Sequence, residues 1–305
     1  GGSRAGSRAC SLELIAAESV MRRLSQGSAQ SGAVDGQRYY REYHGHPVDQ
    51  LQQIVDAFRA DGRPLIWTAG DSSLDNKVWF GESHEALNGY ESLLAPPRMK
   101  ADVNYWMNYF LANRSAANRT AAPYACVNTA IEATSLNDRA CGLLEQDRLI
   151  RDNIGPDDIL VVSVGGNDVA LQPLLCTCCA MFALVYQPLP TWCVEHAACA
   201  CPPNIGLLGD CGCFGCGIPN SISSCLCGFP CGLGYMVDLF KNRVGNYVRS
   251  LVSKRKPKKV VICMIYHLDE EATGSWADGV LGCLCYNCNP HRLQSGIEAA
   301  YRLAT

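Results

Sequence analysis

Apolar and polar positions along this chain fall into two patterns. Four short, nearly unbroken apolar runs bounded by turn residues predict strands over 65–69, 124–129, 159–164 and 260–265. Elsewhere apolar residues recur three and four positions apart, which predicts helices over 11–24, 47–60, 104–113, 137–150, 235–254 and 290–303. Strands that alternate with helices are typical of a parallel sheet covered on both faces, so we expect a three-layer α/β/α fold.

The same pattern predicts how the chain is organised. Residues 1–46 carry one predicted helix and a polar linker, and we expect them to form an N-terminal extension. Residues 47–305 carry all four predicted strands and should form the α/β domain. Within it, 176–233 is dense in Cys, Gly and Pro, which indicates a largely irregular insertion between the third and fourth strands.

Charge and hydropathy exclude two classes of partner. A net charge of −3 over 305 residues gives no basis for nucleic-acid binding. The longest unbroken apolar run, 178–186, is far shorter than the roughly 20 residues that a transmembrane helix needs. We therefore expect neither a nucleic-acid partner nor a transmembrane segment, and the sequence leaves the compartment unknown.

Cysteine is concentrated in the insertion, where twelve of the nineteen cysteines lie between Cys176 and Cys231. A segment with so little apolar area needs cross-links or metal to hold a shape. Three interpretations stay open: disulfide bonds, structural zinc, and reduced thiols that pack like small apolar side chains. An oxidising compartment or an organelle is compatible with the first. The spacing Cys-x-Cys-x-x-Cys occurs twice, so the zinc interpretation names as ligands Cys211, Cys213, Cys216, Cys283, Cys285 and Cys288.

Polar residues follow three of the predicted strands. Gly70-Asp71-Ser72-Ser73 follows the first, Asn128-Thr129-Ala130-Ile131-Glu132 the second, and Gly165-Gly166-Asn167-Asp168 the third. The carboxyl ends of parallel strands meet at one edge of a sheet, where ligands of α/β proteins bind. A serine hydroxyl, backbone N–H groups and an amide at that edge supply a nucleophile and donors for a tetrahedral oxyanion.

The Gly-Asp-Ser and Gly-Gly-Asn-Asp blocks, each after a buried strand, resemble those of the SGNH (GDSL-type) hydrolases. The resemblance covers about residues 64–265 and implies a flavodoxin-like parallel sheet and an ester hydrolase that works through an acyl-Ser72 intermediate without a required cofactor. It implies Ser72 as nucleophile and an oxyanion hole made by the N–H groups of Ser72 and Glu132 and the side chain of Asn167. Asp71 and Asp168 would support the site. Glu132 departs from the family pattern, which has glycine there.

The base that would activate Ser72 is missing from the pattern. The family supplies a histidine three residues after an aspartate, in a loop after a fifth strand. The chain contains no Asp-x-x-His and ends at Thr305, so we expect the last strand and this loop to be lost by truncation. Without them a Ser-His-Asp triad cannot form, and we expect little or no esterase activity.

Two functions follow from these observations. The first is an SGNH-type esterase whose partner is an ester substrate. The second is a non-catalytic structural or accessory subunit that uses a hydrolase-derived fold and binds other proteins in a larger assembly. The missing base and Glu132 favour the second, and the Gly-Asp-Ser and Gly-Gly-Asn-Asp blocks after two of the strands favour the first.

The odd number of cysteines sets a lower bound on reactive thiols. Because each disulfide joins two cysteines, at least one of the nineteen stays outside any set of bonds within the chain. Thiol titration of the unreduced monomer in denaturant should therefore find at least one thiol. A count near nineteen without bound metal would support the reduced-thiol interpretation, and metal analysis of the same sample tests the zinc interpretation.

Overall fold

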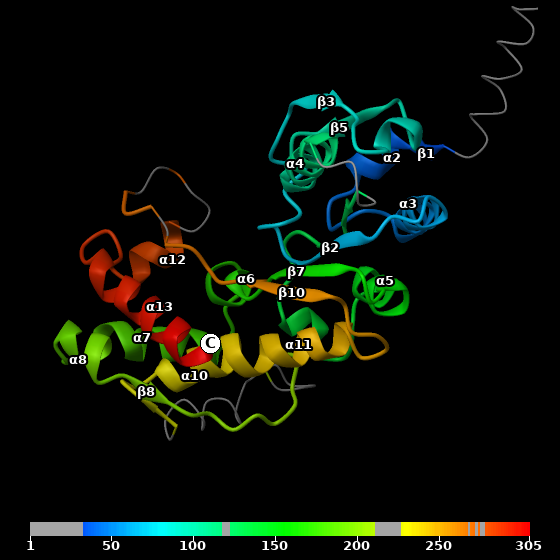
Figure 1. The fold of residues 1–305 in the computed structure, drawn as a ribbon. Helices are drawn as coiled ribbons and strands as arrows, with labels where there is room; N and C mark the ends of the chain where they lie inside the picture. Colours follow the sequence, from blue (N-terminus) through cyan, green and yellow to red (C-terminus); the bar gives the residue numbers. More distant parts are fainter. Residues whose placement is uncertain (1–32, 118–122, 211–226, 268, 272–273, 275–277) are drawn as a thin grey trace, which may run out of the picture.

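A four-stranded parallel sheet forms the centre of the computed structural model, which describes residues 33–117, 123–210, 227–267, 269–271, 274 and 278–305. The strand order is β10-β7-β2-β6 (Figure 1). The strands are β2 (Leu65–Gly70), β6 (Ala125–Asn128), β7 (Ile159–Ser163) and β10 (Lys259–Cys263). All four predicted strands are present, and the α/β class is confirmed. The predicted helix over 11–24 lies outside the described residues.

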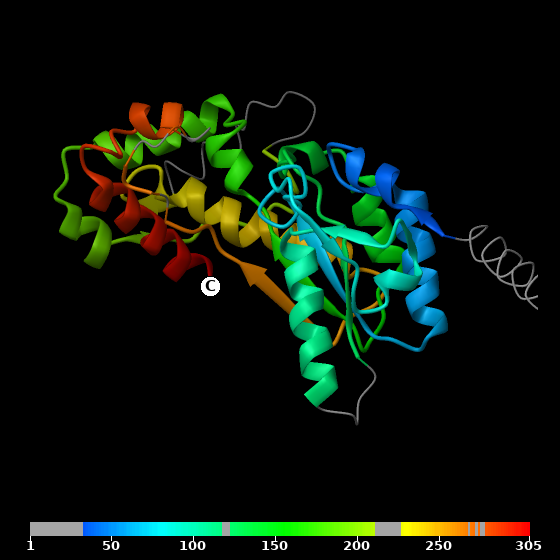
Figure 2. The ribbon, with the colours of Figure 1, turned by 90° about the horizontal axis from the view of Figure 1, so that it is seen from above.

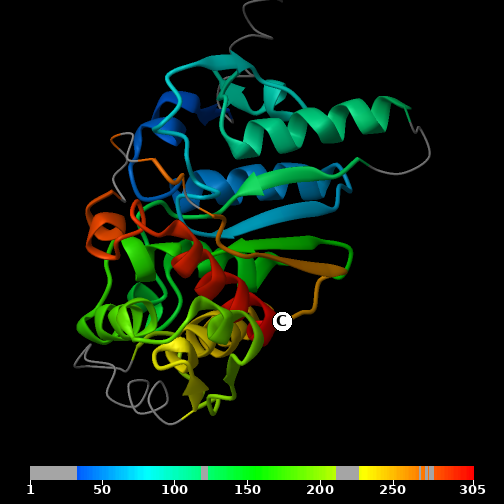
Figure 3. The ribbon, with the colours of Figure 1, turned by 90° about the vertical axis from the view of Figure 1, so that its left-hand side faces the viewer.

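Helices surround the sheet. Helix α3 (Val48–Ala60) contacts α5 (Glu145–Asn153), which contacts α11 (Val244–Leu251), while α4 (Val103–Ala117) contacts the edge strand β6. Figure 3 shows the four strands between α4, next to β6, and α13 (Pro290–Ala304), on the side of β10. No helix in the described ranges combines the length and apolar character needed to cross a membrane.

Two predicted helices differ in detail from those observed. The segment predicted over 235–254 is continuous, but a π-helical turn, Asp238–Arg243, joins α10 (Leu233–Val237) to α11. The helix predicted over 137–150 is reduced to a short 3-10 turn, Asn137–Arg139, followed by α5. The buried Arg139 side chain binds the carbonyl of Ser135 at 2.8 Å and the carboxylate of Asp147 at 2.8 Å, which holds the intervening chain as a loop.

The N-terminal boundary predicted at residue 46 is wrong for the described part of the extension. Strand β1 (Val34–Asp35) pairs in parallel with β4 (Leu94–Ala95), and α2 (Gly36–Arg41) follows it directly. Val34 and Tyr39 are buried in the same core as the sheet. These apolar side chains attach 33–46 to the α/β domain, although the surrounding sequence is polar.

The insertion and the C-terminal segment build a second core beside the sheet. Figures 1 and 2 show that α7 (Leu175–Tyr186), α8 (Thr191–His196), α10 and α13 gather on one side of the strands. Their buried side chains include Ala180, Leu184, Val194, Leu233 and Ala299. The prediction of a largely irregular insertion is therefore wrong for 176–186 and 191–196, which are helical and bury Ala180, Met181, Leu184 and Val194 in this core. A two-residue antiparallel ladder joins β8 (Cys199–Ala200) to β9 (Gly228–Phe229).

A buried carboxylate fixes the start of the central strand. Asp158 accepts hydrogen bonds from the N–H of Leu65 at 2.9 Å, from Trp67 Nε1 at 2.9 Å and from the N–H of Gly155 at 2.7 Å. Both of its oxygens also bind the guanidinium of Arg59. Burial raises the pKa of Asp158, but Arg59 and these donors outweigh burial, so the pKa lies below its usual value and the carboxylate stays charged.

We expect Asp158→Ala to lower the free energy of unfolding by about 3–5 kcal/mol, because buried donors of Leu65 and Trp67 lose their acceptor. Since folding lowers the pKa of Asp158, its contribution is present above the unfolded pKa and is lost as pH falls through the folded pKa. The difference in free energy of unfolding between the wild type and Asp158→Ala should therefore become smaller in acid. Urea unfolding at several pH values measures this difference. Asp157→Ala, at the exposed neighbour, is the control and should cost less than about 0.5 kcal/mol. Equal losses in both variants would contradict this role.

Candidate active site

The loop after β2 begins with a backbone turn that requires glycine. Gly70 has a φ of +128°, and a Cβ atom at this residue would lie 1.7 Å from the carbonyl oxygen of Ser163. The N–H of Asp71 donates to the same carbonyl at 3.0 Å. The chains of β2 and β7 are therefore in direct contact where they leave the sheet, and Ser72 begins the loop there.

The structure distinguishes the two serines that follow. The Ser73 hydroxyl donates to Asp71 Oδ1 at 2.6 Å and lies 2.7 Å from Ser163 Oγ. The Ser72 hydroxyl has no hydrogen-bond partner among the described residues, and Ser72 lines a cavity. Burial raises the pKa of Asp71, and the hydrogen bonds from Ser73 act against that rise. Asp71 thus holds Ser73, while no described residue engages the Ser72 hydroxyl.

Asn167 and Asp168 stand at the start of α6 (Gly166–Ala170), directly after β7. Asn167 lines the same cavity as Ser72, and one N–H of its amide donates to the carbonyl of Thr134 at 2.8 Å, which leaves the other for a ligand. Asp168 is fully buried and accepts from the N–H of Leu136 at 2.8 Å. Burial raises the pKa of Asp168, while the charge of Arg243 lowers it. Asp168 therefore links the loops after β6 and β7.

Glu132 does not supply the donor predicted for it. Its N–H donates to Asp75 Oδ2 at 3.1 Å, and its carboxylate lies 2.9 Å from Lys77 Nζ. Ala133, the next residue, has a φ of +58°, the left-handed conformation that favours glycine. Its N–H has no acceptor among the described residues, and neither does the N–H of Ser72. The glycine-favouring position is thus one residue later than predicted, and an alanine there gives no signal in the sequence.

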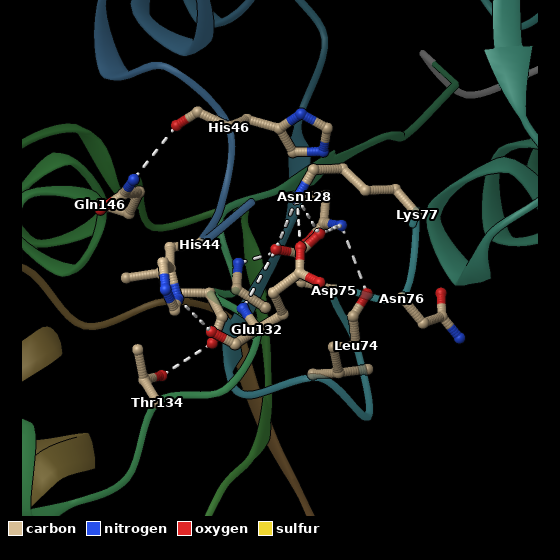
Figure 4. Close-up of polar contacts among 12 residues, drawn as sticks. His44, His46, Leu74, Asp75, Asn76, Lys77, Asn128, Glu132, Thr134 and Gln146 are labelled. Atoms are coloured by element: carbon tan, nitrogen blue, oxygen red, sulfur yellow. Dashed lines mark hydrogen bonds and ion pairs between the residues drawn. The ribbon is translucent and has the colours of Figure 1, made fainter. Parts of the chain in front are cut away.

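A buried cluster of three charges connects the loop after β2 to the loop after β6 (Figure 4). Lys77 Nζ lies 2.9 Å from both oxygens of Asp75 and 2.9 Å from Glu132 Oε2, and all three side chains are at most 1% exposed. Burial raises the pKa of Glu132, and Lys77 acts against that rise. Nothing in the sequence marks Asp75 and Lys77 as buried, because charged residues just after a turn are usually exposed.

Asp, Ser, Asn and Tyr side chains and many apolar ones line a cavity of about 140 Å³ beside Ser72. The Asp, Ser and Asn members all come from the ends of β2 and β7 and the start of α6: Asp71, Ser72, Ser73, Ser163 and Asn167. Tyr301 brings a buried hydroxyl from α13. The remaining walls come mainly from the helices of the second core and from the chain after β10. The sheet topology therefore brings Ser72 and Asn167 to one cavity, as the order of the motifs predicted, and leaves Glu132 outside it.

All six histidines of the chain lie within the described residues, and none of them lines this cavity. His46 is buried, its Nδ1 lies 2.6 Å from the carbonyl oxygen of Tyr39, and burial lowers its pKa to about 4. His44 Nδ1 lies 3.2 Å from the carbonyl oxygen of Glu132. His267 and His291 approach glutamates at 3.8 and 3.3 Å. The described residues therefore provide no imidazole base at Ser72.

The predicted zinc ligands divide between described and undescribed parts of the chain. Cys211, Cys213 and Cys216 lie outside the described residues, while Cys283 ends α12 (Asp278–Cys283) and Cys285 and Cys288 follow it. A hydrogen bond with Cys288 raises the pKa of the Cys285 thiol. Within the described ranges, no group of three or more His, Cys, Asp or Glu side chains is placed to hold a metal ion. The zinc interpretation stays a prediction.

Comparisons with protein-family models, with curated proteins and with solved structures gave no match to this chain.

Replacing Lys77 tests the buried cluster. Lys77→Met leaves two buried carboxylates without their cation, so we expect a loss of about 3–5 kcal/mol in the free energy of unfolding near neutral pH. Removing the cation raises the pKa of Glu132 further, and a carboxyl with a raised folded pKa stabilises the protein at low pH and loses that contribution as pH rises. The deficit should therefore be smaller in mild acid. Denaturant unfolding at several pH values measures this loss, with Lys256→Met, at an exposed lysine, as the control. A loss of stability in Lys77→Met that does not depend on pH would contradict the pairing of Lys77 with the buried carboxylates.

Proposed function

We propose that this protein is a serine ester hydrolase of SGNH type that acts through an acyl-Ser72 intermediate. The observation that carries the proposal is that Ser72 and Asn167, from the ends of neighbouring strands, line one cavity. Ser73, in contrast, is held by Asp71 and Ser163. A nucleophile needs a hydroxyl that is not engaged elsewhere, and Ser72 has one within the described part of the chain.

The reaction divides into two steps. In the first, Ser72 Oγ attacks the carbonyl carbon of the ester and gives its proton to a base, and the alcohol then leaves. In the second, water attacks the acyl group and releases Ser72. The tetrahedral oxyanion of each step would accept hydrogen bonds from the Ser72 N–H and the remaining amide N–H of Asn167. None of these steps requires a metal or an organic cofactor.

The described residues supply no histidine that could act as the base in this reaction. No histidine lines the cavity within the described residues, so Ser72 would react slowly unless a base is added. This same observation favours the second candidate function, a non-catalytic subunit that binds other proteins through a hydrolase-derived fold. The two functions differ in whether the Ser72 hydroxyl reacts once an external imidazole replaces the missing side chain.

A fluorophosphonate probe with added imidazole tests the nucleophile. The serine oxygen forms a bond to phosphorus, fluoride leaves, and imidazole takes the proton. We expect slow labelling at Ser72 that increases with imidazole concentration and is abolished in Ser72→Ala, as read by mass spectrometry of the labelled peptide. Ser73→Ala is the matched control and should still be labelled at Ser72.

The oxyanion role of Asn167 is tested with an activated ester. Asn167→Ala should reduce the imidazole-dependent hydrolysis of para-nitrophenyl butyrate by about 10²–10³-fold, the loss typical for one oxyanion donor. If neither labelling nor hydrolysis depends on Ser72, the proposed hydrolase function is wrong and the subunit interpretation stands.

A further inference from the structure

The cavity beside Ser72 has two chemically different parts. Its Asp, Ser and Asn side chains all lie at the strand ends, beside Ser72 and Asn167, and Tyr301 on α13 adds one buried hydroxyl that has no partner among the described residues. Its other walls are apolar and come from several elements, since Met181 and Leu184 lie on α7, Phe240 on the π-helical turn, and Ile297 on α13. A molecule that fits both parts has one polar group and one hydrocarbon part.

The cavity lies where the two cores meet. Val164 and Phe240 belong to the core around the sheet, whereas Met181, Leu184 and Met236 belong to the second core. Trp79 and Tyr266 also line the cavity, although they are 58% and 64% exposed, which places them at its entrance. The hydrocarbon part would therefore enter past these aromatic rings and lie between the two cores.

The volume indicates how much hydrocarbon the cavity encloses. Its 140 Å³ is close to that of an engineered cavity of about 150 Å³, lined by Leu, Ile and Phe, that stays dry and binds benzene. This corresponds to about six carbon atoms. The Tyr301 hydroxyl could pair with one hydroxyl group of a sugar, but the others would lack hydrogen-bond partners along the rest of these walls, and each buried polar group without a partner is unfavourable.

We propose that this cavity binds the acyl chain of a linear, medium-chain ester, with the ester carbonyl at Ser72 and the chain between α7 and α13. The substrate class would then be an ester of a fatty acid of about six to eight carbons, not an acetylated carbohydrate. The assignment as a substrate rests on the proposed hydrolase function, whereas binding of the chain itself does not.

Binding to the Ser72→Ala variant tests the cavity without any reaction. Octanoate, hexanoate, butyrate and acetate are titrated separately by isothermal calorimetry. Each added methylene buried in the cavity should tighten binding about fourfold, until the enclosed part is filled. Octanoate should bind measurably, and acetate should not. Equal affinities along the series would overturn the proposal, and tighter binding of an acetylated sugar than of octanoate would overturn it in favour of a carbohydrate ester.

Two variants that fill the cavity provide the structural test. Ala170 and Ile297 line the cavity and are only partly buried, so Ala170→Phe and Ile297→Trp place added volume inside it with little strain on the core. Each should weaken octanoate binding at least about tenfold. Leu171→Phe is the matched control, because Leu171 is 42% exposed and does not line the cavity. Circular dichroism identifies a variant that fails to fold. If one of the two cavity-filling variants does not fold, octanoate binding to the other tests the proposal.

The outcomes of the labelling and binding experiments distinguish the acyl-chain cavity from the proposed hydrolase function. Labelling at Ser72 whose rate does not depend on the alkyl length of the fluorophosphonate would keep the hydrolase and overturn the acyl-chain cavity. Chain-length-dependent binding of fatty acids without any labelling at Ser72 would keep the cavity and overturn the hydrolase.

Discussion

The direct contact between Gly70 and the carbonyl of Ser163 is the constraint on which the rest of the site depends. No side chain fits between them, since a Cβ atom at residue 70 would lie 1.7 Å from that oxygen. This contact brings the carboxyl ends of β2 and β7 together, so the loops that carry Ser72 and Asn167 leave the sheet side by side. A glycine without functional groups thus determines where the serine hydroxyl lies.

Buried carboxylates then fix the loops around this contact. Asp158 satisfies donors at the start of β2, Asp75 and Glu132 surround Lys77, and Asp168 accepts from the loop after β6. Each connects segments that are far apart in the sequence, and each is buried enough that losing its partner would leave an uncompensated group. The charges therefore tie these loops together, and the removal of one partner is expected to destabilise the protein.

The second core gives the site its shape. The helices of the insertion and of the C-terminal segment pack against one another and face the strand ends across an apolar cavity. Under the proposed hydrolase function, the Ser72 hydroxyl at the polar end of this cavity would meet the ester carbonyl, but no histidine of the described residues lines the cavity to take its proton. The described residues thus place a hydroxyl and an amide at one end of the cavity without an imidazole beside them.

The sequence alone predicts the four strands, their parallel arrangement and the meeting of Ser72 with Asn167 at one edge of the sheet, because period and turn chemistry are local properties. The strand order comes from the structure. These 305 residues contain no Asp-x-x-His. The sequence could not show that α7 is a helix inside the cysteine-rich segment, since that depends on the packing of Ala180, Met181 and Leu184 with α10 and α13. Nor could it show that the Glu132 N–H binds Asp75, that Lys77 is buried, or that Ala133 has a positive φ. These features depend on contacts between loops distant in the sequence, and such contacts exist only once the chain has folded.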